Sequence, residues 1–190
     1  GKPIMLKWTR DDEHAWEPYG SAMVVKMQAS LDTQGGVKAW NHDVWSYSHS
    51  GRPRSLQGAS NLLAAGHLKK PLQPPLPRPG KGAHGGIHRN ADPLYSFARR
   101  RVVKHFVPNS PLRVSALRGL GAFANVFAIE SFMDELAQAA NIDPVEFRLR
   151  HLHDPRARAV IEAAAVLANW QSGPSWENNK REKGRGQGIG

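Results

Sequence analysis

The sequence predicts an α+β fold, with a mixed or antiparallel sheet followed by a helical segment. Short apolar runs separated by turn residues fill much of the first hundred residues. Between residues 122 and 169, by contrast, apolar residues recur every three or four positions. The first pattern is typical of strands and the second of amphipathic helices. We therefore expect the sheet to form from the first hundred residues and the helices to lie beside it.

Four stretches of the chain have the composition of strands. They span residues 3–9, 21–31, 37–47 and 100–107. A cluster of turn residues at positions 32–36, ending in Gly35 and Gly36, separates the second stretch from the third. Glycine adopts positive φ at no steric cost, so this cluster predicts a hairpin. The acidic residues 11–13 are expected in a solvated polar turn.

Residues 48–92 are rich in Ser, Gly, Pro and His and hold one short helical candidate at residues 60–68. The prolines of residues 71–79 fix φ and push their predecessors out of the helical region, which predicts an extended surface crossing. His84 and His88 would share a metal at this spacing only on a helix, and the surrounding glycines disfavour one. The sequence therefore favours a Gly-rich loop with surface histidines and no metal ligand.

A strong helix is predicted in the stretch from residue 115 to residue 140. Its apolar face is wide enough to predict burial around much of the circumference. The face consists of Phe123, Val126, Phe127, Phe132, Met133, Leu136, Ala137 and Ala140. Glu130 and Asp134 interrupt it at i, i+4 spacing. A carboxylate on such a helix pairs with a base or works in a site, and pairing with an arginine is the expected case.

Two further helices have clear start signals. Asp143 precedes Pro144, and Asp154 precedes Pro155, which places an N-cap and then a proline at the first helical position. The last helix is expected to run to about Asn169. The polar residues 171–183 follow, and the glycine-rich residues 184–190 are either a flexible tail or the opening of a further strand.

Composition narrows the classes of protein to consider. The chain has no cysteine, which excludes disulfides, thiolate metal sites and cysteine nucleophiles. No apolar run approaches the ~20 residues that a membrane span requires. The net charge is +10, but the basic residues are spread along the chain without neighbouring aromatic residues. This distribution favours a solvated basic surface, and no nucleic-acid partner, over a stand-alone nucleic-acid-binding module.

The segment Arg118-Gly119-Leu120-Gly121 is the one place where a binding chemistry can be read directly. The first N–H groups of a helix lack internal partners and carry partial positive charge. Glycines allow close approach of a ligand, and an arginine adds a planar fork of donors. Together these features predict an anion site, although the same segment is also compatible with ordinary turn geometry. No hydrolase nucleophile motif, P-loop or dinucleotide-binding glycine motif is present.

Several segments resemble the molybdenum-cofactor-binding subunits of the xanthine dehydrogenase and aldehyde oxidase family. Residues 113–122 lead into residues 127–137, and residues 143–152 follow at the family's spacing. Residues 7–13 and 41–47 resemble upstream segments of the same family. The branch looks most similar to the large (beta) subunits of bacterial isoquinoline 1-oxidoreductases.

The resemblance implies a molybdenum hydroxylase that oxidises an N-heterocycle or an aldehyde, with water as the source of oxygen. It implies a molybdenum–pterin cofactor, expected in the cytosine dinucleotide form. Electrons would pass to a small subunit with two 2Fe–2S clusters, and a cytochrome c or flavin protein is a further candidate partner. Arg118, Gly119 and Gly121 match cofactor-loop positions. Leu120 stands where many relatives carry a substrate-facing aromatic residue.

The resemblance also implies that the chain is an internal piece of a longer subunit. Residues 1–110 would be the C-terminal part of one cofactor-binding domain, and residues 111–190 the linking helices and the start of a second. The family's catalytic carboxylate belongs to a motif that these residues lack, so the chain is expected to hold no catalytic residue and to be inactive alone. A periplasmic and a cytoplasmic location both stay open. A basic binding module and a non-catalytic remnant are the alternatives.

Overall fold

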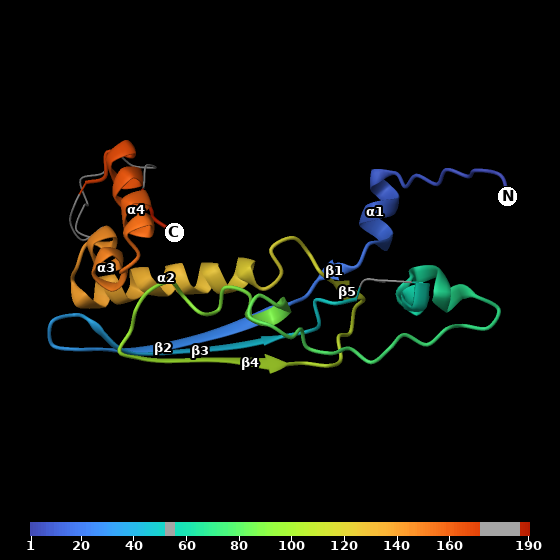
Figure 1. Ribbon diagram of the computed structural model, residues 1–190, viewed down its shortest axis with the longest axis horizontal. Coiled ribbons are helices and arrows are strands. Elements are labelled where there is room, and N and C mark those ends of the chain that lie inside the picture. The colour runs from blue at the N-terminus through green and yellow to red at the C-terminus, as the bar shows by residue number, and fades with distance from the viewer. Residues whose placement is uncertain (52–55, 172–186) are drawn as a thin grey trace.

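A computed structural model describes residues 1–51, 56–171 and 187–190, and shows one long helix lying along a three-stranded sheet (Figure 1). The sheet contains β2 (Met23–Leu31), β3 (Val37–Ser46) and β4 (Arg99–Phe106), in that order. β2 and β3 are antiparallel, whereas β3 and β4 are parallel. The prediction of an α+β fold with a mixed sheet is therefore confirmed.

The β2–β3 hairpin forms where the turn residues predicted it. Gly35 has a φ of 80°. Asp32 Oδ1 accepts hydrogen bonds from the backbone N–H groups of Gln34 and Gly36, both at 2.8 Å. The hydrogen bond from Gly36, and after it the bond from Gln34, lowers the pKa of Asp32. An acidic side chain and a glycine thus close the loop together.

The strand predicted at residues 3–9 is wrong. Residues 1–9 are exposed and form no helix or strand, and the next residues form helix α1 (Arg10–Trp16). The acidic residues assigned to a turn belong to this helix. Thr9 Oγ1 accepts from the Asp12 N–H, and the Asp12 carboxylate accepts from the Thr9 N–H at 2.9 Å. This capping box starts a helix, and no described strand pairs with residues 3–9.

A second, two-stranded sheet joins β1 (Tyr19–Gly20) to β5 (Val114–Ser115) in parallel. It connects the segment after α1 with the segment before the long helix. The helical candidate at residues 60–68 is replaced by two short 3-10 helices, η1 (Leu56–Asn61) and η2 (Leu63–His67). Residues 71–79 form no helix or strand, as the prolines predicted. A third 3-10 helix, η3 (Gly86–His88), interrupts the Gly-rich loop.

The helices α2 (Ala122–Ala140), α3 (Pro144–His151) and α4 (Pro155–Leu167) confirm the predicted helical segment. The Asp143 side chain accepts from the N–H groups of Val145 and Glu146, and Asp154 accepts from that of Arg156. Both predicted caps are therefore present. Of the predicted tail, residues 172–186 lie outside the described residues, and residues 187–190 form no strand. No helix among the described residues has the length and apolar character needed to cross a membrane.

The hydrophobic core lies between α2 and the sheet. It comprises Val37, Trp40, Tyr95, Ile129, Met133, Leu136, Ala137, Phe147 and Leu152. Trp40 stacks on Phe97 with ring centroids 4.7 Å apart. The opposite side of α2 is open, with Phe123 82% and Phe127 72% exposed. The expectation that α2 is buried around much of its circumference is thus wrong, because a sheet covers only one of its faces.

The chain is elongated and leaves much surface exposed. Helices α3 and α4 lie at one end of α2, whereas α1 and the N-terminus lie beyond the other (Figure 1). The accessible surface is 13815 Å². A folded monomer of this mass exposes about 9,000 Å². The core therefore organises the sheet and α2, and none of the first 16 residues is fully buried.

Candidate cofactor-binding site

The predicted cofactor loop, Arg118 to Gly121, is a tight turn that leads directly into α2. Gly119 has a φ of 88° and Leu120 a φ of 53°. Leu120 N–H donates to the Leu117 carbonyl, and Ala122 N–H donates to the Gly119 carbonyl, both at 3.0 Å. A leucine in the left-handed region is uncommon, so the surrounding bonds hold this loop in a specific conformation.

Arg118 and Gly119 form the exposed part of this loop. The Arg118 side chain is exposed, and no hydrogen bond or ion pair engages it among the described residues. A Cβ built at Gly119 would have a single atom within 4 Å, the Phe123 backbone nitrogen at 4.0 Å. The missing side chain therefore leaves space in front of the first turn of α2. A free guanidinium beside such a space fits an anionic group.

Gly121 has a different environment. Its N–H donates to the Gly86 carbonyl at 3.0 Å. A Cβ there would overlap the Ile87 carbonyl oxygen and lie 2.6 Å from the Gly86 oxygen. A glycine at this position lets the backbone of α2 pack closely on η3, while its amide is already occupied. Leu120 is half-buried between these two environments.

A buried polar pair behind the loop was not predicted from the sequence. Asn125, in the first turn of α2, and His42, in the middle of β3, are both 0% exposed. Asn125 Nδ2 donates to the carbonyls of Ile87 at 2.8 Å and Arg89 at 3.0 Å, and Asn125 Oδ1 lies 3.1 Å from His42 Nε2. The available signal was that each residue interrupts an apolar pattern. His42 alternates with Trp40 and Val44, and Asn125 shares a helix face with Ile129.

Burial lowers the pKa of His42, outweighing the Asn125 hydrogen bond and the Asp43 carboxylate, and burial also lowers the pKa of His49. Below the ordinary value of 6.5, the unfolded chain binds protons that the folded chain does not. The contribution of these two neutral histidines to the free energy of unfolding is therefore fully present above that pH. It is lost as the pH falls toward their pKa values in the folded state. We expect the free energy of unfolding to fall as the pH decreases below the ordinary value of 6.5, and His42→Gln to reduce this fall.

Urea denaturation at a series of pH values measures this profile. His49→Gln should also reduce the slope, and the double variant should show a smaller pH dependence than either single variant. A profile that His42→Gln leaves unchanged would contradict the assignment of a neutral, buried His42.

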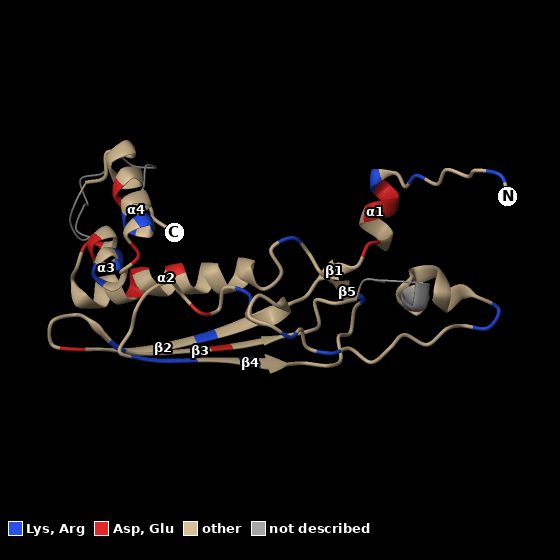
Figure 2. Ribbon diagram, viewed as in Figure 1, with Lys and Arg blue, Asp and Glu red and all other residues tan. Residues whose placement is uncertain are grey.

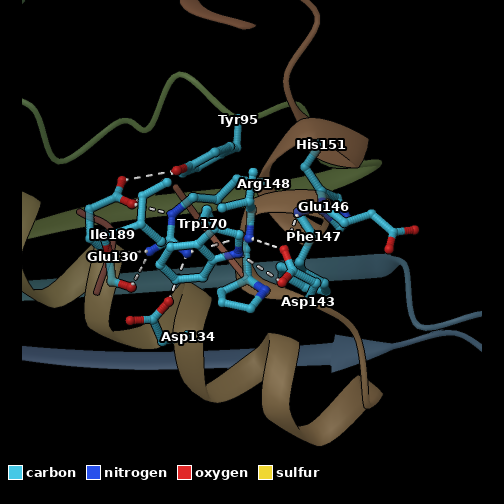
Figure 3. Close-up of polar contacts among 12 residues, drawn as sticks. Tyr95, Glu130, Asp134, Asp143, Glu146, Phe147, Arg148, His151, Trp170 and Ile189 are labelled. Carbon is cyan, nitrogen blue, oxygen red and sulfur yellow. Dashed lines mark hydrogen bonds and ion pairs between the residues drawn. The ribbon is translucent and has the colours of Figure 1, made fainter. Parts of the chain in front are cut away.

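A second polar cluster surrounds Arg148, which is 1% exposed (Figure 3). Its Nε donates to Glu130 Oε2 at 2.9 Å, and its Nη1 donates to Asp134 Oδ1 at 2.7 Å. The predicted pairing of these carboxylates with an arginine is confirmed. Tyr95 Oη donates to Glu130 as well, and burial and the Glu130 charge raise the pKa of Tyr95. With their oxygens engaged in this way, the carboxylates join α2 to α3.

One cavity lies away from the loop. It has a volume of about 910 Å³ and lies between the Pro-rich segment and β5, where Ser48, Leu76, Arg78 and Ser115 contribute to its lining. None of residues 118–121 lines it. His88, in the Gly-rich loop, bonds to the Gly82 carbonyl at 2.6 Å and faces Lys104. Within residues 1–51, 56–171 and 187–190, no three His, Asp or Glu side chains form a potential metal site.

Comparison with known proteins shows that the loop lies within a match to a cofactor-binding domain. The family described as the molybdopterin cofactor-binding domain matches residues 77–152, which include the Gly-rich loop, the cofactor loop, α2 and α3. The B subunit of nicotinate dehydrogenase from Pseudomonas putida is 37% identical over 90% of this chain, and the match covers 13% of that protein. The beta subunit of isoquinoline 1-oxidoreductase from Brevundimonas diminuta is 26% identical over 90% of the chain and 20% of that protein.

A shorter match reaches the xanthine dehydrogenases. The xanthine dehydrogenase molybdenum-binding subunit of Escherichia coli O157:H7 is 58% identical over 36 residues, which are 19% of this chain and 5% of that protein. The chain thus spans about a fifth or less of the curated relatives it matches. The domain match and these relatives confirm the resemblance of the motifs around Arg118 and α2. The chain belongs to the molybdenum-cofactor-binding subunits of the xanthine dehydrogenase family.

Proposed function

We propose that this chain forms the cofactor-loop region of a molybdenum hydroxylase subunit. The observation that carries the proposal is the exposed Arg118, which bonds to no other described residue, beside the open space at Gly119, within a match to a molybdopterin cofactor-binding domain. Arg118 would donate to an anionic or oxo group of the cofactor, and the Phe123 amide would add a backbone donor. Gly121 would set the position of this loop through its contact with Gly86.

The cofactor, when bound, supplies the two-electron oxidation of the substrate carbon. We infer the cytosine dinucleotide form from the resemblance to the bacterial branch. Leu120 is proposed to face the substrate. A leucine supplies apolar contact without the stacking surface of an aromatic ring, so shape complementarity to a planar substrate would be weaker at this point.

The proposed substrate is an N-heteroaromatic compound, with an aldehyde as the second class. The names of two relatives, a nicotinate dehydrogenase and an isoquinoline 1-oxidoreductase, support the first class. Water would provide the oxygen, and a subunit with two 2Fe–2S clusters would accept the electrons, with a cytochrome c or flavin protein as a further partner. These are properties of a whole enzyme. The chain matches 13% of the length of the first relative and 20% of the second.

We propose that residues 1–110 belong to one cofactor-binding domain and that residues 111–190 link it to a second. The strands of the larger sheet lie in the first range and the three longer helices in the second. Because the family's catalytic carboxylate lies in a motif that these residues lack, the 190 residues alone are expected to be inactive.

The distribution of charge favours this proposal over a nucleic-acid-binding module. Lys and Arg are scattered over the N-terminal segment, the sheet, the loops and the helices (Figure 2). Several are engaged within the chain, since Arg101 pairs with Asp43 at 2.7 Å and Arg148 with Glu130. A nucleic-acid surface would instead present a continuous basic stripe.

The function is tested with the full-length subunit and its electron-transfer partner in oxygen-18-labelled water. Nicotinate, isoquinoline and benzaldehyde are supplied with a dye as electron acceptor, and the products are analysed by mass spectrometry. The proposal expects a hydroxylated heterocycle that carries the label. Product labelled only from molecular oxygen, or no oxidation of any of the three compounds by molybdenum-loaded protein, would contradict it.

We expect Arg118→Met to lower the molybdenum content of the purified full-length protein by roughly 10-fold or more, because a charge-assisted hydrogen bond contributes about 1.5–3 kcal/mol. Metal analysis by mass spectrometry measures this content. Arg156→Met is the control, since Arg156 is exposed on α4 and its ion pair with Asp154 spans 3.4 Å. Equal molybdenum content in both variants would exclude Arg118 as a cofactor ligand.

A further inference from the structure

We propose that His42 and Asn125 are positioning residues for the cofactor loop, with Asn125 acting directly on the start of α2 and His42 acting through Asn125. The inference deepens the proposed function and rests on it. Neither residue belongs to the loop, and both are fully buried behind it. Their role would be to fix where Arg118 and Gly119 lie relative to the sheet.

The hydrogen bonds of Asn125 give it one orientation. Both of its amide hydrogens are used, because Nδ2 donates to the Ile87 and Arg89 carbonyls. Asn125 Oδ1 is therefore an acceptor, and His42 Nε2, at 3.1 Å, must carry the hydrogen. His42 is then neutral when Nδ1 carries no hydrogen, and burial favours this form because it lowers the pKa of His42. The histidine, the amide and two backbone carbonyls thus form a directed chain from β3 to the residues around η3.

The same backbone segment contacts the loop itself. Gly86 accepts the Gly121 N–H, and the Asn125 N–H donates to the Gly121 carbonyl, both at 3.0 Å. Gly121 is therefore held at its amide by Gly86 and at its carbonyl by Asn125. Residues 86–89 and the start of α2 are joined through backbone and side chain together. Since Gly119 and Leu120 have positive φ immediately before this point, a shift of Gly121 would displace both.

The buried pair of His42 and Asn125 lowers stability more than a purely structural role would require. His42 Nδ1 is buried and has no hydrogen-bond partner among the described residues. An unsatisfied buried polar atom destabilises the folded state, and an apolar pair of the same shape would avoid this cost. Polar pairs of this kind supply direction, which an apolar contact does not. Fixing a loop that holds a ligand is a function that requires direction.

The test uses the full-length subunit with His42→Phe, His42→Gln and Asn125→Leu. Phe fills the space without a donor, whereas Gln restores one. Molybdenum retention is followed during dialysis, and hydrogen exchange is followed at the amides of residues 119–124. We expect roughly 10-fold faster loss of molybdenum in His42→Phe and Asn125→Leu, with faster exchange at these amides, and near wild-type behaviour in His42→Gln.

Tyr95→Phe is the matched control, because it removes hydrogen bonds to Glu130 at another point along α2. Its retention of molybdenum should equal that of the wild type. The inference is overturned if His42→Phe retains molybdenum as well as the wild type does. It is also overturned if Tyr95→Phe loses molybdenum as fast as His42→Phe does. If Asn125→Leu does not fold, the comparison of His42→Phe with His42→Gln decides whether the inference holds. If the wild type holds no molybdenum, the proposed function fails, while amide exchange still tests whether His42 fixes the loop.

Discussion

Replacing Arg148 with Met is expected to lower the free energy of unfolding by about 3–5 kcal/mol, because it removes one partner of a buried ion pair. Arg148 Nε and Nη1 bond to the Glu130 and Asp134 carboxylates, and Nη2 donates to the Glu130 carbonyl at 3.0 Å and the Ile189 carbonyl at 3.2 Å. Met fills most of the space but donates no hydrogen bond, so the partly buried Glu130 charge loses its counterion.

Urea denaturation followed by circular dichroism measures the change. Arg150→Met is the control, because Arg150 lies on the same helix, is 46% exposed and pairs with an exposed Glu146. Its effect should stay below about 0.5 kcal/mol. A loss of less than about 1 kcal/mol in Arg148→Met would show that the cluster does not hold α2 to α3.

Gly121→Ala is expected to lower the free energy of unfolding by about 3 kcal/mol. It should also reduce the molybdenum content of the purified full-length protein. The added Cβ overlaps the Ile87 carbonyl oxygen, and neither this backbone nor that of Gly86 is a flexible side-chain end that can move aside. The start of α2 must therefore shift away from η3. Because Arg118 and Gly119 precede Gly121 closely, the shift would displace the predicted cofactor ligands.

Gly66→Ala provides the control for this substitution. No atom lies within 4 Å of the position that a Cβ would take at Gly66. Denaturation and metal analysis of the two variants should therefore diverge strongly, with Gly66→Ala close to the wild type. A Gly121→Ala protein that unfolds like the wild type would disprove the close packing of α2 on η3.

Local signals in the sequence predicted several elements that short-range chemistry determines, although the capping box that starts α1 was missed. The hairpin at Gly35, the caps at Asp143 and Asp154, and the extended proline tract all depend on residues within a few positions of one another. Residues 3–9 show the limit of this approach. Their composition suits a strand, but a strand also needs a partner to accept its hydrogen bonds, and none is present among the described residues.

Burial was harder to predict than the elements themselves. The predicted apolar face of α2 is only partly correct. Met133, Leu136 and Ala137 are buried, whereas Phe123 and Phe127 are exposed, because periodicity cannot show how many elements pack around a helix. The pairing of Glu130 with an arginine was expected, but the choice of Arg148 among the many arginines required the fold. Contacts between distant segments decide such choices.

Some residues of the candidate site could likewise be predicted from local signals, whereas others depend on contacts between distant segments. Arg118 and the glycines could be found because a helix start, a glycine and an arginine are adjacent in the chain. The contact of Gly121 with Gly86 could not, since 34 residues separate them and both look like ordinary turn glycines. His42 and Asn125 left a weaker trace, a polar residue within an apolar pattern, whose meaning appears only once β3 and α2 are packed together.

The most direct test is the molybdenum and pterin content of the purified wild-type subunit, measured by metal analysis and by fluorescence of the oxidised pterin. If this chain belongs to a working cofactor-binding subunit, about one molybdenum and one pterin should be found for each polypeptide. Folded subunit, produced in a host that makes the cofactor, that contains neither would contradict the proposal that Arg118 and the start of α2 hold it.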